Sequence, residues 1–217
     1  METDDLPLKL NAMTITPDVI PDIISGIGVI LIAWFSYNQH AKNKLIDFKI
    51  DEYKQQLKEK NTKDAESAAI IYGELWRALH ELKTDRVYIV QPHPWQSNRF
   101  LTITMEVKKK GVSAMKPNVQ SLPMSEVANF VAVIAKEKFI RYNDISADVV
   151  DKHAKAIMGI SGVLSMAIQR LENTDGKWIG NIFCEHTQKI CWDCMKCEKV
   201  LSELAKIISP ILPDYEG

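Results

Sequence analysis

The residues in this sequence best suited to chemistry are four cysteines, all of which lie between Cys184 and Cys197. Cys191, Cys194 and Cys197 follow an i, i+3, i+6 spacing, so on a helix they share one face. With Cys184 and His186 they form a candidate Cys₃His or Cys₄ set for Zn²⁺, or thiolate ligands for an iron–sulfur cluster. A continuous helix does not easily converge three thiolates on one tetrahedral ion. We therefore favour buried or redox-silent cysteines over a metal or redox centre.

No other pattern of residues predicts catalysis. The sequence contains no nucleophile elbow, no glycine-rich loop for phosphates and no paired catalytic carboxylates. Its 27 Lys and Arg residues balance 28 Asp and Glu residues, which gives a formal net charge of −1. A general nucleic-acid-binding protein needs a basic face to neutralise phosphates. We therefore expect a protein that is not an enzyme and that does not bind nucleic acid.

An apolar run near the N-terminus, Ile23–Gln39, contains 17 residues and no Asp, Glu, Lys or Arg. As a helix it would cover about 25 Å, close to the hydrocarbon thickness of a bilayer. Acidic residues precede the run and no small-residue cleavage site follows it, which argues against a signal peptide. The pattern predicts a single transmembrane helix over 20–41, after a short N-terminal segment over 1–19. A buried core helix is the alternative.

The flanking cations predict an orientation for this span. Only Lys9 precedes it, whereas Lys42, Lys44, Lys49 and Lys54 follow it closely. Cytoplasmic flanks of membrane spans carry an excess of positive charge. We therefore expect the N-terminus outside and the larger C-terminal part in the cytoplasm.

The segment over 42–83 has helical composition, with no proline and a single glycine. Its apolar positions follow a three-four spacing that slips between Leu57 and Asn61, as a stutter does. The seam consists of Ile46, Ile50, Tyr53, Leu57, Asn61, Asp64, Ala68, Ile71, Leu75, Ala78 and Leu82. Two alternatives follow: a parallel, coiled-coil-like dimeric stalk, or a lone amphipathic helix that packs on the next domain.

After Thr84 the sequence changes to short β-rich runs that alternate with helical ones, over 84–212, and a tail over 213–217 follows. The patterns predict strands over 85–91, 99–107, 139–142, 163–171 and 177–184, and helices over 124–138, 151–158 and 192–208. This order predicts one α+β domain with an antiparallel sheet flanked by helices.

The domain resembles the GAF family in two places. The stretches 85–89, 101–107 and 122–125 are similar to the opening of a GAF domain. The later stretches Gly159–Ile168 and Gly176–His186, followed by Trp192, show an isoleucine-glycine approach to a strand, a hairpin and a Cys-Glu-His-Thr end. The resemblance covers Ser67–Leu212 and implies a GAF-like α+β fold.

Members of the GAF family that perform specific chemistry carry motifs that this sequence lacks. There is no Phe-x-x-x-Asp-Glu signature of cyclic-nucleotide binding, and no cysteine before Cys184 that could attach a bilin. Members that reduce methionine sulfoxide use cysteines in a segment that here, over 111–122, contains none. The resemblance therefore implies a ligand-binding or dimerising module with no bound cofactor.

A ligand pocket is expected between the predicted sheet and its helices. The side chains predicted to face it are Phe100, Thr102, Phe130, Ile134, Tyr142, Met158 and Met166. The alternative is that these side chains fill the space as ordinary core.

These patterns together predict a single-pass membrane protein with a GAF-like sensing or interaction domain. It would act by dimerisation through the helical stalk, or through a protein partner, rather than by catalysis. The layout is also similar to one class of bacteriophage holins, which form membrane lesions and whose soluble domain is regulated by a partner. That domain lies in the periplasm, opposite to the side that the lysines predict here. A cysteine-based metal or redox protein is the third alternative.

Overall fold

A computed structural model of the protein describes residues 20–94, 98–213 and 215. Within helix α1 (Ile20–Glu81), the side chains of residues 20–33, 40–43 and 45–47 lie outside this description. The chain divides into two units, Met1–Lys60 and Asn61–Gly217, and α1 contributes residues to both.

The first unit contains the N-terminal part of α1, which coincides with the predicted membrane span. In the part of the chain that the structure describes, no helix combines the length and the apolar character needed to cross a membrane. The side chains of 20–33, which form most of the apolar run, lie outside that part. The predicted span over 20–41 therefore gains no support from the structure.

The second unit is built on a six-stranded antiparallel sheet with the strand order β3-β2-β1-β6-β5-β4. Its strands are β1 (Arg86–His93), β2 (Phe100–Lys108), β3 (Leu122–Pro123), β4 (Phe139–Tyr142), β5 (Ser165–Glu172) and β6 (Trp178–His186). All five predicted strands are present, and β3 was not predicted. The predicted α+β class, with an antiparallel sheet and flanking helices, is confirmed.

Helices lie between the strands and after the last one. They are the 3₁₀ helices η2 (Lys116–Asn118) and η3 (Met124–Val127), and the α-helices α2 (Ala128–Ile134), α3 (Ile145–Asp148), α4 (Lys152–Ile160) and α5 (Cys194–Ile208). Aspartates cap the two longest of them. Asp151 accepts hydrogen bonds from the backbone amides of His153 and Ala154 in α4, and Asp193 accepts one from the backbone amide of Lys196 in α5.

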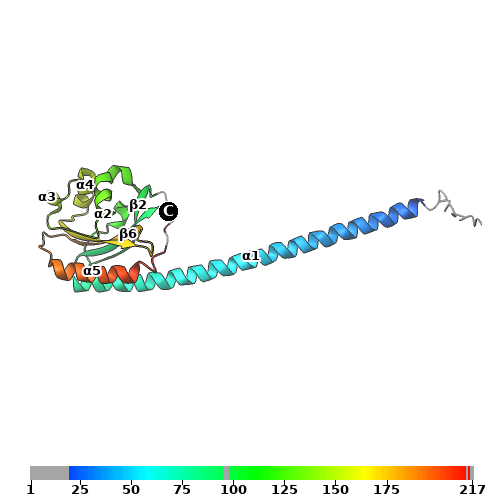
Figure 1. The fold of residues 1–217 in the computed structure, drawn as a ribbon, viewed down its shortest axis with the longest axis horizontal. Helices are drawn as coiled ribbons and strands as arrows, with labels where there is room; N and C mark the ends of the chain where they lie inside the picture. The colour runs from blue at the N-terminus through cyan, green and yellow to red at the C-terminus, as the bar shows by residue number, and fades with distance from the viewer. Residues whose placement is uncertain (1–19, 95–97, 214, 216–217) are drawn as a thin grey trace, which may run out of the picture. The chain divides into compact units, whose positions relative to one another are not determined.

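Each face of the sheet carries its own apolar core. The last turns of α1 and the whole of α5 cover one face, and α2 and α4 cover the other (Figure 1). Val87 and Ile89 of β1 belong to the core under α1 and α5, whereas Tyr88 and Val90 belong to the core under α2 and α4. The central strands are therefore apolar on both faces, because each face is buried.

The C-terminal part of the predicted seam lies against its own domain. Ile71, Leu75 and Ala78 are fully buried in the core under α1 and α5. These positions are therefore occupied within one chain and cannot also form the seam of a dimeric stalk. The opposite stripe of α1 is exposed at Ile70 and Trp76.

A β-bulge divides the apolar positions of β2 between the two cores. Ile89 pairs with Met105 and Val90 pairs with Ile103, which leaves Thr104 as the extra residue. Ile103 therefore faces the α2–α4 side and Met105 the α1–α5 side, although the two share one parity in the sequence.

Candidate functional site

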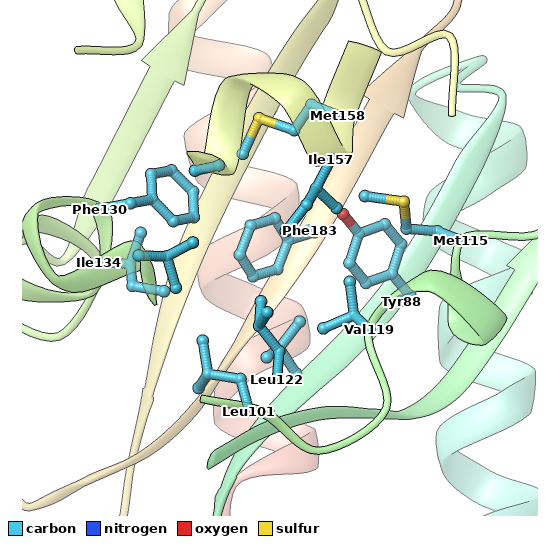
Figure 2. A pocket seen from close by; sticks show the side chains of 13 residues that line it. Tyr88, Leu101, Met115, Val119, Leu122, Phe130, Ile134, Ile157, Met158 and Phe183 are labelled. Carbon is cyan, nitrogen blue, oxygen red and sulfur yellow. The ribbon is translucent and has the colours of Figure 1, made fainter. Parts of the chain in front are cut away.

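The candidate site is a partly open apolar cavity of about 40 Å³ between the sheet and the layer that contains α2 and α4 (Figure 2). Its lining comes from β1, β2, β3 and β6, from the residues on either side of η2, from η3, and from the two helices of that layer. The lining residues are Tyr88, Val90, Leu101, Met115, Val119, Leu122, Val127, Phe130, Ile134, Ala154, Ile157, Met158 and Phe183.

Aromatic rings form one wall of the cavity. The rings of Tyr88 and Phe183, which are paired across β1 and β6, stack with centroids 5.1 Å apart. Phe130 of α2 approaches Phe183 with centroids 6.3 Å apart. The side chains of Met115 and Met158 lie on two other sides of the space (Figure 2). Because methionine is unbranched and adaptable, these two side chains are the ones best able to make room for a ligand.

The volume limits what this cavity can hold. About 30 Å³ is the share of one water molecule in the liquid, whereas pockets for drug-sized ligands span about 300–1,000 Å³. In the conformation described, the cavity therefore admits only a very small apolar molecule. Anything larger requires its lining side chains to move.

Three of the seven side chains predicted for the pocket line the cavity: Phe130, Ile134 and Met158. Met166 and the half-buried Tyr142 belong to the same core but lie outside the cavity lining. Phe100 and Thr102 do not line it, because Leu101 and Ile103 are the β2 residues that face this core and alternate residues of a strand face opposite ways.

The lining residues that the sequence did not reveal come mainly from the central strands and a loop. Tyr88 and Val90 lie in a strand that is apolar at every position from Val87 to Val90. The sequence therefore does not show which of these residues face the cavity. Met115 and Val119 lie in a turn-rich stretch without periodicity. Only contacts between distant segments bring them to the cavity.

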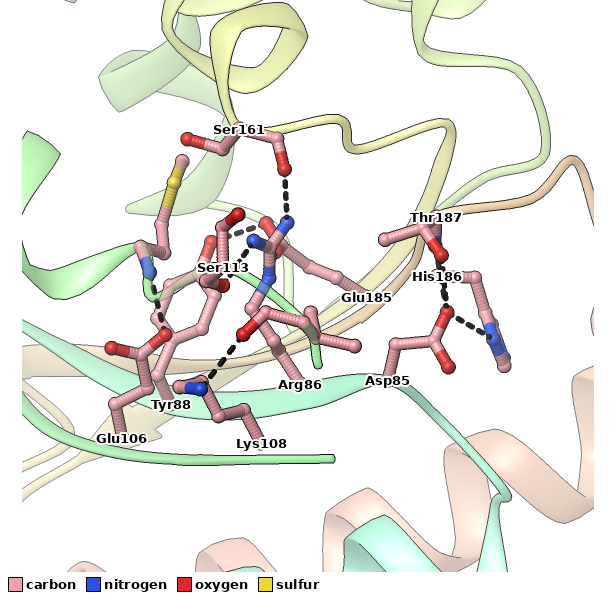
Figure 3. A network of polar contacts seen from close by, with 12 residues as sticks. Asp85, Arg86, Tyr88, Glu106, Lys108, Ser113, Ser161, Glu185, His186 and Thr187 are labelled. Carbon is pink, nitrogen blue, oxygen red and sulfur yellow. Dashed lines mark hydrogen bonds and ion pairs between the residues drawn. The ribbon is translucent and has the colours of Figure 1, made fainter. Parts of the chain in front are cut away.

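A polar network centred on a fully buried ion pair adjoins the cavity (Figure 3). The Nε of Arg86 donates to Oε2 of Glu185 at 2.9 Å, and neither side chain has any exposed surface. The remaining guanidinium nitrogens donate to the backbone oxygens of Ser113, at 2.8 Å, and Ser161, at 3.0 Å. The Tyr88 hydroxyl donates to Oε1 of Glu185 at 2.5 Å. Each charge in the network is thus compensated, as a buried ion pair requires.

Burial determines the protonation of this network. It raises the pKa of the Tyr88 hydroxyl well above its usual value, so that group remains a hydrogen-bond donor. Burial also raises the pKa of the Glu185 carboxyl, an effect that Arg86 and the Tyr88 hydroxyl oppose.

The same network holds the loops around the cavity. Ser113 precedes Met115 in the loop after β2, and Ser161 follows the end of α4. The backbone amides of Met115 and Lys116 donate to the Glu106 carboxylate, at 2.6 and 3.0 Å. Arg86 therefore connects two cavity-lining segments to the central strands.

A carboxylate joins the two helices of that layer. Oδ1 of Asp151 accepts hydrogen bonds from the amides of His153 and Ala154, and Oδ2 accepts one from the Phe130 amide at 3.3 Å. Burial tends to raise the pKa of Asp151, but these backbone hydrogen bonds outweigh it and lower the pKa below its usual value. α2 and α4 are thereby held together over the cavity.

The cysteines lie away from this cavity. Cys184 and Cys197 are buried, whereas Cys191 and Cys194 are exposed, and all four are free thiols. α5 begins at Cys194, so Cys191 precedes the helix and the predicted common helical face does not form. Within the described ranges, no group of three or more His, Cys, Asp and Glu side chains could hold a metal ion. Burial raises the pKa of Cys197 to about 12.

Comparison with known proteins places this architecture in one structural class. Neither a protein-family model nor a curated protein sequence matches the chain. The GAF domain of PixJ from Thermosynechococcus elongatus, in its blue-light absorbing form, superposes with a TM-score of 0.55 at 13% identity, over 68% of this chain and 88% of that one. The domain of a putative two-component sensor histidine kinase from Sinorhizobium meliloti gives 0.50 at 12% identity, over 64% and 87%.

A third structure, the phycocyanobilin-bound GAF domain of a cyanobacterial phytochrome, has a TM-score of 0.50 at 16% identity, over 69% of this chain and 93% of that one. At such identities these similarities establish the fold. The chain has a GAF-like α+β fold.

The residues around the cavity do not fit a bilin. The cavity lining contains no cysteine, and Tyr88 is its only polar side chain. A volume of about 40 Å³ is also far below the several hundred Å³ of ordinary cofactor pockets.

Proposed function

We propose that this protein is a non-catalytic sensor in which the cavity takes up a small apolar ligand and transmits its occupancy to α1. One observation carries the proposal: Tyr88 lines the cavity with its ring and donates its hydroxyl to the buried ion pair of Glu185 and Arg86. A change at the cavity is thus coupled to the strands that α1 covers.

The coupling follows the two faces of β1. A ligand larger than the cavity would displace the Met115 loop, which Arg86 and Glu106 hold. Arg86 and Tyr88 flank Val87, which packs on the other face in the core that contains Leu75 of α1. A ligand can shift α1 only if it binds two arrangements with different affinity, so the network must differ between them.

We further propose that α1 pairs with α1 of a second copy through its exposed stripe. Ile70 is 51% exposed and Trp76 is 44% exposed, although the opposite stripe is fully buried. Between them, Gly73 has open space where a side chain would be, which allows close approach of another helix. Exposed apolar residues at helical spacing are a common feature of association surfaces.

Attachment to a membrane through Ile23–Gln39 stays a prediction from the sequence. The holin-type alternative depends on the same predicted span, and no contact within the GAF-like domain supports it. Flotation of the full chain with liposomes tests the anchor, and release of a trapped dye from those liposomes separates the two alternatives. Flotation without release would favour an anchored sensor, and release would favour the lesion-forming protein.

Binding in the cavity is tested by methyl NMR of the full chain under xenon pressure, since apolar protein cavities bind xenon. We expect graded shifts for the methyl groups of Leu101, Ile134 and Ile157. Val119→Ile adds a methyl group to the lining and should suppress them, whereas Val133→Ile, at a half-exposed position of α2, should not. Absence of shifts, or shifts that Val119→Ile leaves unchanged, would overturn the proposal.

A further inference from the structure

A second cavity, of about 270 Å³, lies where the end of α1 meets the segment that leads into α5. Its lining includes Lys83 after α1, His186 at the end of β6, and Cys191, Trp192 and Lys196 around the start of α5. None of its lining residues is shared with the first cavity. The volume approaches that of sites for small organic molecules.

Two cationic side chains around this second cavity are available to an anion. The ammonium groups of Lys83 and Lys196 have no hydrogen bond or ion pair with any residue that the structure describes. The lining also contains two acidic residues, and each has a hydrogen-bond or ion-pair partner. Glu81 pairs with Arg77 at 3.3 Å, and Asp193 accepts the Lys196 backbone amide at 3.2 Å as the cap of α5.

The same cavity contains thiols of two kinds. Cys197 is 1% exposed, and burial keeps it protonated. Cys191 is exposed and belongs to the same lining, so it is the thiol that an incoming molecule can reach. Cys194 is also exposed, but it does not line the cavity. An accessible thiol beside two unpaired ammonium groups is suited to react with a negatively charged partner.

We propose that Cys191 is a site of S-thiolation by small anionic disulfides. Lys83 and Lys196 bind the carboxylates of the incoming disulfide. The Cys191 thiol loses its proton to solvent, and the thiolate attacks one sulfur of the incoming disulfide. A new sulfur–sulfur bond forms as the old one breaks, and the other half of the reagent leaves as a thiolate that takes up a proton. The reagent is the oxidant, so no further reactant is needed.

The experiment compares two reagents of opposite charge on the full chain. Oxidised glutathione is anionic and cystamine is cationic; each is added to the reduced protein, and adducts are mapped by mass spectrometry over time. Rates are divided by those of the same reagents with a neutral cysteine peptide. We expect one adduct, on Cys191, with a normalised rate that is higher for oxidised glutathione.

Lysine variants test the role of the charges. Lys83→Gln and Lys196→Gln should each slow the reaction with oxidised glutathione about twofold to fivefold, the range for an exposed ion pair. Lys199→Gln is the matched control, because Lys199 is exposed on α5 but does not line the cavity. Cys191→Ser should abolish the adduct. An adduct on Cys194, an internal disulfide, or equal normalised rates for the two reagents would overturn the proposal.

Discussion

The hydroxyl of Tyr88 donates a hydrogen bond to the Glu185 carboxylate at 2.5 Å, between residues 97 positions apart in the chain. The two residues stand on the neighbouring central strands β1 and β6. The Tyr88 ring lines the apolar cavity, so this single contact joins the candidate binding space to the buried charge pair. The proposed sensing mechanism depends on this contact.

Tyr88→Phe removes that contact while it keeps the ring. The Glu185 oxygen would remain buried without its donor, so we expect a loss of about 1–3 kcal/mol in the free energy of unfolding. Urea denaturation measures the loss. Tyr142→Phe is the control, because Tyr142 lies in the same core and should change the stability by less than about 0.5 kcal/mol. Equal effects of the two substitutions would contradict the role given to the Tyr88 hydroxyl.

Arg86→Met leaves Glu185 as a buried charge without its partner. Breaking such a pair costs about 3–5 kcal/mol, so we expect a large fall in stability by denaturant unfolding. Arg86→Met with Glu185→Leu replaces the pair by apolar side chains and should be less destabilised than Arg86→Met alone. Lys54→Met removes the exposed pair with Asp51 and should have little effect. A double variant as unstable as the single one would argue against a charge effect.

The hydrogen-bonded carboxylate of Asp85 should make the free energy of unfolding depend on pH in the acid range. Partial burial tends to raise its pKa, but hydrogen bonds from Thr187 and Lys109 prevail and lower the pKa to about 2, from 3.8. A carboxyl with a depressed pKa stabilises the fold fully above its unfolded pKa, and the contribution fades as pH falls through the folded value. The free energy of unfolding should therefore decrease between pH 4 and pH 2, and less steeply in Asp85→Asn. Parallel pH profiles of the two proteins would contradict this assignment.

Trp76→Glu tests the association surface on α1. The side chain is 44% exposed and makes its ring contact within α1, where it stacks on His80. A charge at this position should weaken self-association, because the exposed stripe would no longer be apolar. Sedimentation velocity of the full chain should show a shift toward monomer, with the unfolding midpoint nearly unchanged. Lys58→Glu, at an exposed position of the N-terminal unit, is the charge control.

The sequence predicted the fold better than it predicted the site. Five strands and the main helices follow from the local alternation and periodicity of apolar residues. These patterns predict the elements because each element buries one face. The assignment of Phe100 and Thr102 to the cavity failed for a non-local reason. The bulge at Thr104 reverses which residues of β2 face each side, so Leu101 and Ile103 face the cavity side in place of Phe100 and Thr102. The bulge exists only in the pairing of β2 with β1, and no pattern within β2 marks it.

Arg86 shows the second limit of prediction from sequence. An arginine at the start of a strand is ordinarily exposed, yet here it is fully buried because Glu185, 99 residues away, and two backbone oxygens compensate its charge. Ile71, Leu75 and Ala78 show a related limit. Their spacing fits a dimer seam and a domain-facing stripe equally, and only the contact with the sheet decides between them.

Methyl NMR of α1 during uptake of xenon is the most direct test of coupling between the cavity and α1. In the wild-type chain, the methyl groups of Leu75 and Leu79, across the sheet, should shift together with that of Leu101. In Tyr88→Phe, the Leu101 shift should persist and the α1 shifts should largely disappear. Coupling through Tyr88 is contradicted if the α1 methyl groups do not respond to xenon, or if they respond equally without the Tyr88 hydroxyl.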